Sequence, residues 1–185
     1  MSANPQTPLA LAVPDDATLV AQAVAGNERA FTLLYRRHAR YVAGVVYRLL
    51  GSDADLDDVM QETFCDAAAA LGSLREPSRP RPWLARIAVH RVYARLARRR
   101  RSRWLLGATT VLAPKVSDPA ERERVVALYE ILERLAPKVR TPWVLHVIGG
   151  ESLPDVAAVC EVSLATVKRR VAEAEQAVQR GLDET

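Results

Sequence analysis

The chain has few of the residues that would place it outside the cell or in a membrane. It has only two cysteines, Cys65 and Cys160, far apart and outside any CxxC or Cys/His spacing, so neither a disulfide framework nor a zinc site is indicated. No apolar run approaches the roughly 20 residues that span a bilayer, and the first residues lack the basic start and apolar stretch of a secretory signal. These absences predict a cytoplasmic protein without direct membrane insertion.

The sequence also lacks the arrangements on which catalysis usually depends. His38, His90 and His146 are scattered, and no nucleophile, paired-carboxylate or glycine-loop pattern accompanies them. Each histidine is better explained as a satisfied or exposed side chain than as a ligand. We therefore expect no enzyme activity, no cofactor, no metal and no small-molecule substrate.

Aromatic residues are scarce as well, at 5%, whereas apolar residues make up 49% and charged residues 26%. A core would therefore be built mainly from Ala, Val and Leu. Apolar positions recur at spacings of three and four throughout, and no strand pattern competes with them. The sequence predicts an all-α protein.

Prolines and glycines divide this helical pattern into two small domains. The first domain would hold a helix pair broken at Gly26 and Asn27, a helix from Ser52 to about Leu71, a proline-rich loop at 72–82 and a helix at 83–104. The second would hold helices at 120–135 and 137–148, followed by two short ones. The expected units are a disordered tail at 1–16, a first domain at 17–104, a flexible linker at 105–120 and a second domain at 121–185.

Charge is strongly segregated along the chain. From Leu49 to Leu74 there are six acids and no Lys or Arg, whereas Pro77 to Ser117 holds ten arginines, one lysine and no acid. A block of one sign repels itself unless an anion neutralises it, and a polyanion such as DNA gains by releasing its counterions. The arginine run at 98–101 therefore favours nucleic-acid binding over a merely solvated helix end.

The acidic segment has two explanations. Acids in a first helical turn, such as Asp53 and Asp55, complement the helix dipole and require no partner. Asp58, Gln61 and Glu62 lie beyond that turn at spacings of three and four, which places them on one exposed face suited to a basic or polar protein surface. Local charge leaves both explanations open.

The segment 151–171 has the pattern of a helix-turn-helix. Ser152 and Asp155 match a capping box, and Ser163 can cap a second helix. In this geometry the second helix enters the major groove with its N-terminal part against base edges. The residues that would face or flank DNA there are Thr166, Lys168, Arg169 and Arg170. An ordinary helical hairpin with two caps would look similar.

Taken in order, three segments resemble the extracytoplasmic-function sigma factors, and the resemblance covers residues 19–181. The family's polymerase-binding helix, close to D-x-x-D-x-x-Q-E-x-F, resembles DLDDVMQETFCDAAAAL at 55–71. Its minus-ten helix resembles PWLARIAVHRVYARLARRRR at 82–101, and its minus-thirty-five recognition helix resembles LATVKRRV at 164–171. The resemblance implies a sigma factor that directs core RNA polymerase to promoter DNA and that a dedicated anti-sigma protein blocks until a signal arrives.

By position, the resemblance assigns three sets of contact residues. The set implied to dock on the clamp helices of the large polymerase subunit is Asp58, Gln61 and Glu62. The loop from Leu74 to Pro82 and the helix beyond it would capture flipped bases and hold phosphates, through Arg79, Arg81, Arg86, His90, Arg91, Arg95, Arg98, Arg99, Arg100 and Arg101. The upstream element would contact Ser163, Thr166, Lys168, Arg169 and Arg170.

The chain departs from the family pattern at four positions. His90 stands where asparagine is usual, Glu161 replaces a glycine at the helix-turn-helix corner, and Glu173 and Glu175 stand where basic residues are usual. A non-glycine residue at positive φ costs about 1 kcal/mol, so the corner is expected to be strained or differently shaped.

Two alternative functions therefore remain. A helix-turn-helix regulator could bind duplex DNA without polymerase, but it leaves the acidic helix face unexplained. A helical adaptor could bind polymerase or an anti-sigma protein without promoter reading, and the three unusual acids motivate it.

Overall fold

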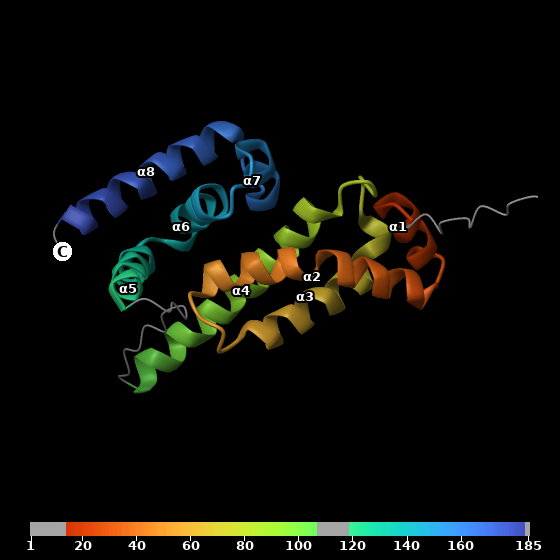
Figure 1. Cartoon of the computed structure of the whole chain (residues 1–185), viewed down its shortest axis with the longest axis horizontal. Helices are drawn as coiled ribbons and strands as arrows, with labels where there is room; N and C mark the ends of the chain where they lie inside the picture. Colours follow the sequence, from red (N-terminus) through yellow and green to blue (C-terminus); the bar gives the residue numbers. More distant parts are fainter. Residues whose placement is uncertain (1–13, 107–118, 184–185) are drawn as a thin grey trace, which may run out of the picture.

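The structure, a computed structural model, describes residues 14–106 and 119–183, and all the regular secondary structure in these residues is helical (Figure 1). The first group of helices comprises α1 (Asp16–Val24), α2 (Glu28–Leu50), α3 (Leu56–Ala70), a 3-10 turn (Leu71–Ser73) and α4 (Pro80–Leu106). The second comprises α5 (Pro119–Arg134), α6 (Pro137–Trp143), a π-helical turn (Val144–Ile148), α7 (Leu153–Cys160) and α8 (Leu164–Asp183). The all-α prediction is confirmed over these ranges. None of the helices described is both long and apolar enough to cross a membrane.

Local sequence explains where the first helices begin and end. The Asp15 side chain accepts a hydrogen bond from the Thr18 backbone N–H at 2.8 Å, and Asn27 caps α2 through the Ala30 N–H at 3.2 Å. Gly51 ends α2 with a φ of 73°, a conformation that glycine adopts without a Cβ penalty. The predicted break at Asn27 and the stop at Gly51 are confirmed.

Three predicted helix bounds are wrong. Helix α3 begins at Leu56 rather than at Ser52, and residues 51–55 form bends and a turn before it. Helix α4 begins at Pro80 rather than at residue 83, because a proline in the first turn lacks only an N–H that would have no helical partner. Helix α8 is 20 residues long rather than short, since no proline or left-handed glycine interrupts it. Most of the predicted tail and linker, at 1–13 and 107–118, lies outside the described residues.

The core consists of aliphatic side chains, as the composition predicted. In the first group, valines of α2 and α3 pack against leucine and alanine of α4, and Trp83 is buried among them. Burying one such aliphatic side chain stabilises the fold by about 1.5–3 kcal/mol. This packing fixes α3 beside α4, and so fixes the acidic segment beside the basic one.

The two groups of helices contact each other directly. Helix α7 packs on α4, the π-helical turn lies against α2, and the Tyr93 hydroxyl of α4 donates a hydrogen bond to Thr141 Oγ1 of α6 at 2.8 Å. A Cβ at Gly51 would lie 2.8 Å from a ring carbon of Tyr129 on α5. Helix α8 lies on the side of α6 away from α2 and α4 (Figure 1). The sequence left this relative placement open.

Candidate functional site

The acidic face of α3 is divided between solvent and α4. The Asp58 side chain is 65% exposed and Gln61 is exposed, whereas Glu62 is 31% exposed. Arg95 of α4 reaches both acids, with its Nη1 3.3 Å from Asp58 and its Nη2 3.2 Å from Glu62. The predicted trio therefore shares one edge of α3, but Glu62 is already turned toward an arginine of the same chain.

Further ion pairs join α3 to α4. Arg91 donates two hydrogen bonds to the Asp66 carboxylate, and this hydrogen bonding lowers the pKa of Asp66 below its ordinary value. Arg99 Nε lies 2.6 Å from Asp55, which Arg95 also contacts at 3.3 Å. The basic segment was expected to need an external anion, but the acids of α3 already neutralise these arginines. An arginine carries five N–H donors, so each retains some for a further partner.

The end of the basic helix differs from its middle. Arg98 and Arg101 are exposed, and neither makes an ion pair with any residue that the structure describes. The side chain of Arg100, also in the predicted set, lies outside the described residues. Exposed guanidinium groups at this end of α4 are available to phosphates.

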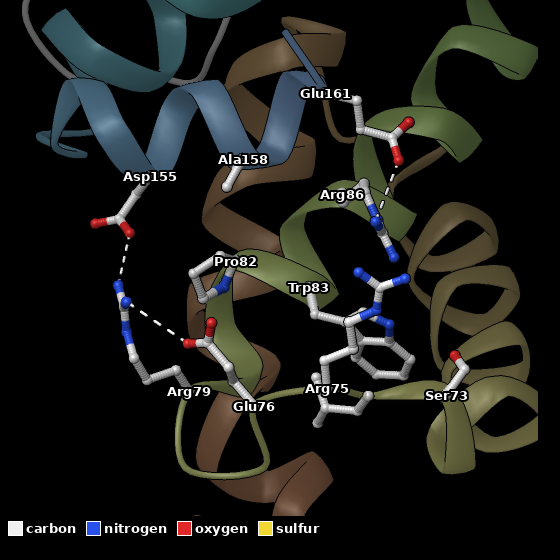
Figure 2. A pocket seen from close by; sticks show the side chains of 11 residues that line it. Ser73, Arg75, Glu76, Arg79, Pro82, Trp83, Arg86, Asp155, Ala158 and Glu161 are labelled. Atoms are coloured by element: carbon white, nitrogen blue, oxygen red, sulfur yellow. Dashed lines mark hydrogen bonds and ion pairs between the residues drawn. The ribbon is translucent and has the colours of Figure 1, made fainter. Parts of the chain in front are cut away.

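A pocket of about 630 Å³ opens beside the start of α4 (Figure 2). The loop before α4 and the first turns of α4 form one wall, and α7 forms the other (Figure 2). Its lining residues are Ser73, Leu74, Arg75, Glu76, Arg79, Pro82, Trp83, Arg86, Asp155, Ala158 and Glu161. The loop that was predicted to capture bases therefore forms one wall of this pocket. Sequence reasoning did not predict the second wall, which α7 forms.

Basic residues around this pocket contact carboxylates of the second group. Arg79 donates to Asp155 at 2.7 Å, and Arg86 donates to Glu161 at 3.1 Å, as the dashed lines in Figure 2 show. His90 Nε2 lies 3.4 Å from Glu161. These partners are 75 or 76 positions apart in the sequence for the two arginines, so no local pattern could have paired them.

Arg81, another residue of the predicted set, has a different environment. Its guanidinium lies 4.1 Å from the centre of the Tyr41 ring, and its Nη2 lies 3.8 Å from Glu151. Burial, and then the Glu151 carboxylate, raise the pKa of Tyr41. Arg81 is therefore held by stacking and charge between α2 and the loop before α7.

A second hollow, of about 450 Å³, lies between α2 and α3 next to Gln61. Phe31, Tyr35, Met60 and Phe64 line it, and the rings of Tyr35 and Phe64 meet edge to face at 4.6 Å. Phe31 and Tyr35 stand at helical spacing with other apolar residues, a pattern that indicates an apolar helix face but not a groove. A tyrosine on that face was the available signal, because its hydroxyl favours contact with solvent.

The helix-turn-helix has the predicted caps. The Asp155 N–H donates to Ser152 Oγ, and the Thr166 N–H donates to Ser163 Oγ, both at 3.2 Å. The corner residue Glu161 has φ 54° and ψ 42°, so the expected left-handed conformation is present. Ser163 and Thr166 also bond each other through their hydroxyls, at 2.8 Å.

The basic residues of α8 point in different directions. Lys168 and Arg169 are exposed, whereas Arg170 is half-buried and its charge acts on Tyr93 and Cys160. Burial raises the pKa of Cys160 to about 11. Only Lys168 and Arg169 among these three side chains are fully presented to solvent.

Comparison with known proteins gives one consistent result for both groups of helices. Residues 34–102 match sigma-70 region 2, and residues 126–178 match sigma-70 region 4. The RNA polymerase sigma factor CnrH of Cupriavidus metallidurans is 35% identical, over 92% of this chain and 96% of its own. The ECF RNA polymerase sigma factor SigM of Mycobacterium tuberculosis is 32% identical, over 89% and 83%.

Two solved structures share the fold. CnrH in complex with the cytosolic domain of CnrY matches with a TM-score of 0.67 and 32% identity, over 91% of this chain and 97% of that one. The sigma factor RpoE from Bartonella quintana, in complex with the anti-sigma factor NepR, matches with a TM-score of 0.67 over 83% and 96%. Its identity is 21%, so this second likeness concerns the fold alone.

Proposed function

Because the chain belongs to the extracytoplasmic-function sigma factors of the sigma-70 family, we propose that it divides promoter selection between its two groups of helices. The protein is an RNA polymerase sigma factor that acts in transcription initiation. In the proposal, the domain at 17–104 docks on core polymerase and opens the minus-ten element, and the domain at 121–185 reads the minus-thirty-five element. It acts in the cytoplasm by binding, without catalysing a reaction.

The polymerase-binding surface is the exposed edge of α3 together with the groove beside it. Asp58 and Gln61 supply polar contacts, and the groove lined by Phe31, Tyr35 and other apolar side chains supplies area to bury. Protein interfaces commonly combine such an apolar centre with a polar rim. Glu62 borders this surface, where its ion pairs with α4 hold it in a fixed orientation.

The minus-ten element binds at the pocket beside the start of α4, and this pocket is the observation that carries the proposal. Its size is within the range of 300–1,000 Å³ that is usual for small-molecule sites, and Arg75, Trp83 and Arg86 line it. A base that leaves the duplex can be held there by stacking and hydrogen bonds, so strand opening draws on binding energy.

Phosphates of the same element lie along α4. Arg98 and Arg101 are exposed for this role, and Arg91, Arg95 and Arg99 contribute the donors that their carboxylate partners leave free. The remaining members of the proposed minus-ten set are Arg79, Arg81, Arg86, His90 and Arg100.

The minus-thirty-five element is read by the N-terminal part of α8. Lys168 and Arg169 are exposed there, and Ser163, Thr166 and Arg170 complete the proposed set. Glu175, one of the acids that motivated the adaptor alternative, accepts a hydrogen bond from the Trp143 indole. Because Glu175 is bonded within its own domain, its presence is not an argument that the chain has lost promoter recognition.

An anti-sigma protein is the proposed regulator. CnrH was solved in complex with the cytosolic domain of CnrY, and the RpoE protein, which this chain resembles in fold, with the anti-sigma factor NepR. CnrH covers nearly the whole chain at 32% identity, which supports a partner of the same class here.

Reconstitution tests the proposal. The purified protein and core polymerase are incubated with fragments of the source genome, and transcript start sites are mapped. Initiation at a defined set of promoters is the expected result. Duplex binding without polymerase would instead identify a regulator, and polymerase binding without promoter-specific transcripts would identify an adaptor.

A pair of variants locates the docking surface. Gln61→Arg is expected to abolish polymerase binding, because it places a bulky charge on the edge of α3 without breaking an ion pair. Gln22→Arg is the matched control, since Gln22 is also exposed and helical but lies on α1. Equal polymerase affinity of the two variants would remove Gln61 from the interface.

A further inference from the structure

One face of α2 carries arginines that belong to none of the contact sets proposed above. Arg29, Arg36 and Arg40 are exposed, and none of them makes an ion pair with any residue that the structure describes. Leu33, which is 43% exposed, completes a row at spacings of four, three and four, so the four side chains share one side of the helix. Buried positions such as His38 lie on the opposite side. We call this row the α2 stripe.

The chain neutralises its neighbouring arginines but not those of the α2 stripe. Arg37, on the same helix, donates to Asp16 at 2.7 Å, and Arg91 and Arg95 pair with acids of α3. Helix α2 has one acid, Glu28, and it precedes the stripe by a single residue, so it does not share the stripe's row. Like charges in one row repel each other, and an anion from outside the chain relieves this repulsion.

The α2 stripe starts beside the proposed minus-ten site. The guanidinium carbon of Arg81, a member of the minus-ten set, lies 4.1 Å from the centre of the Tyr41 ring, and Tyr41 directly follows Arg40 in α2. Arg81 also lines a pocket of about 240 Å³ together with Asp16, the partner of Arg37 on α2. One end of the stripe therefore lies within a helical turn of a residue assigned to the minus-ten element.

The length of the stripe suits a short piece of single strand. Arg29 and Arg40 are 11 positions apart, which is about 16 Å along a helix axis. At the spacing of about 3.4 Å that bases keep within one strand of DNA, this length corresponds to about four or five nucleotides. Guanidinium groups bind phosphates through paired N–H donors. Leu33, between two of the arginines, offers apolar surface to a base that has left the duplex.

The stripe fits a phosphate backbone better than it fits a protein partner. The pockets of about 630, 450 and 240 Å³ include no residue of the stripe. Protein partners usually anchor a few large side chains in such pockets, and the groove beside Gln61 is a surface of that kind. A backbone of phosphates needs a row of positive charge and no pocket.

We propose that the α2 stripe is a further DNA contact, at which Arg29, Arg36 and Arg40 bind phosphates of the opened strand where it continues from the minus-ten site. The proposal rests on the function assigned above to the pocket beside α4, because that pocket holds the adjoining bases. It extends that function, since the minus-ten set contains no residue of α2. Contacts to phosphates do not read sequence, so the stripe stabilises the opened strand whatever bases follow the element.

Titration of the full-length chain with a single strand measures the contact. The probe is a fluorescein-labelled random strand of about 30 nucleotides, because phosphate contacts do not depend on sequence. The test variant replaces the three stripe arginines: Arg29→Gln/Arg36→Gln/Arg40→Gln. The matched control removes three exposed helical arginines of the second group: Arg124→Gln/Arg134→Gln/Arg180→Gln. Glutamine has nearly the helix propensity of arginine, so both variants are expected to keep their helices, which circular dichroism checks.

The stripe variant is expected to bind the strand about three- to ten-fold more weakly than the control at 0.1 M salt. The slope of log affinity against log salt concentration should become shallower by up to about 2, since each phosphate contact to a single strand contributes about 0.7. The control should keep the slope of the parent. Equal affinity and slope in the stripe variant and the control would overturn the inference.

A second variant separates this inference from the function on which it rests. Arg98→Gln/Arg101→Gln removes two exposed members of the minus-ten set on α4. If it weakens strand binding and the stripe variant does not, the inference is wrong and the assignment of α4 to DNA stands. If only the stripe variant weakens binding, the assignment of phosphates to α4 is wrong instead. If neither variant does, both are wrong.

Photocrosslinking in the complex with core polymerase identifies the class of partner. A benzophenone amino acid replaces Leu33 in the full-length chain, and the probe is a promoter fragment from the reconstitution with a label on its non-template strand. Leu182 of α8, which is 44% exposed, carries the same replacement as the control. A crosslink from position 33, and not from 182, to the opened part of the labelled strand is the expected result. Crosslinks from position 33 to a polymerase subunit without any to DNA would overturn the inference and identify a protein contact.

Discussion

The indole N–H of Trp143 on α6 donates a hydrogen bond to the carboxylate of Glu175 on α8. Trp143 is 4% exposed, so the bond satisfies a donor that water reaches poorly. On charge alone, Glu175 counted against DNA binding by its helix. Its position shows instead that it fastens α8 to α6, and this keeps the recognition helix in place.

Glu175→Ala should lower the free energy of unfolding by about 1–3 kcal/mol, because it leaves the Trp143 N–H buried without an acceptor. Glu175→Gln should lose less, since its amide oxygen can still accept. Urea denaturation followed by circular dichroism measures both. Glu173→Ala, at an exposed position two residues away in the same helix, should change stability by no more than about 0.5 kcal/mol. Equal losses at 173 and 175 would contradict the role of Glu175.

Glu161→Gly should be more stable than Glu161→Gln by about 1 kcal/mol. Both variants lose the carboxylate that contacts α4, but only glycine relieves the strain of a φ of 54°. The comparison of the two thermal or urea midpoints isolates the backbone contribution. A glutamine variant as stable as the glycine variant would mean that the corner is not held in the left-handed conformation.

Arg95→Met should destabilise the protein by about 1–3 kcal/mol. Arg95 is 18% exposed and contacts Asp55, Asp58 and Glu62, so its loss leaves three acids of α3 without this counter-charge. Methionine keeps much of the apolar packing of the side chain. The same substitution at the exposed Arg98 is the control and should stay within about 0.5 kcal/mol of the parent. If both variants lose the same stability, the contacts of Arg95 contribute nothing.

Alkylation should distinguish the two cysteines. With a pKa of about 11, Cys160 holds only roughly one thiolate per thousand molecules near pH 8, whereas Cys65 is exposed at the groove beside Gln61. Mass spectrometry of iodoacetamide-treated protein should therefore find Cys65 modified first. Saturating core polymerase should slow that reaction if the groove is the docking surface. An unchanged rate for Cys65 would place docking elsewhere.

The sequence predicted the features that depend on neighbouring residues. Ser152, Asp155 and Ser163 form the expected caps, and Gly51 ends its helix, because each acts within one turn of its own position. The corner at Glu161 was likewise located correctly. The three contact sets remain proposals, although the exposure of Asp58 and the pocket beside α4 support them.

Features that depend on packing were beyond the sequence. The acids of α3 and the arginines of α4 were interpreted as surfaces for two external partners, yet Asp66 and Arg91 pair with each other. Such a pair forms only because the apolar cores bring the two helices together, and charge counts along a chain carry no such information. The pairing of Arg79 with Asp155 depends further on how the two domains meet.

Gly51 stands apart from the charged contacts between the domains. Its backbone has a φ of 73°, and the Tyr129 ring occupies the space where a side chain would begin. Any other residue there would meet a steric obstacle and a backbone penalty together. A steric contact of this kind does not depend on ionic strength, whereas salt screens the attraction between carboxylates and guanidinium groups. The two groups of helices therefore meet through two kinds of contact. Added salt weakens the ion pairs, but it leaves the contact of Gly51 with Tyr129 unchanged.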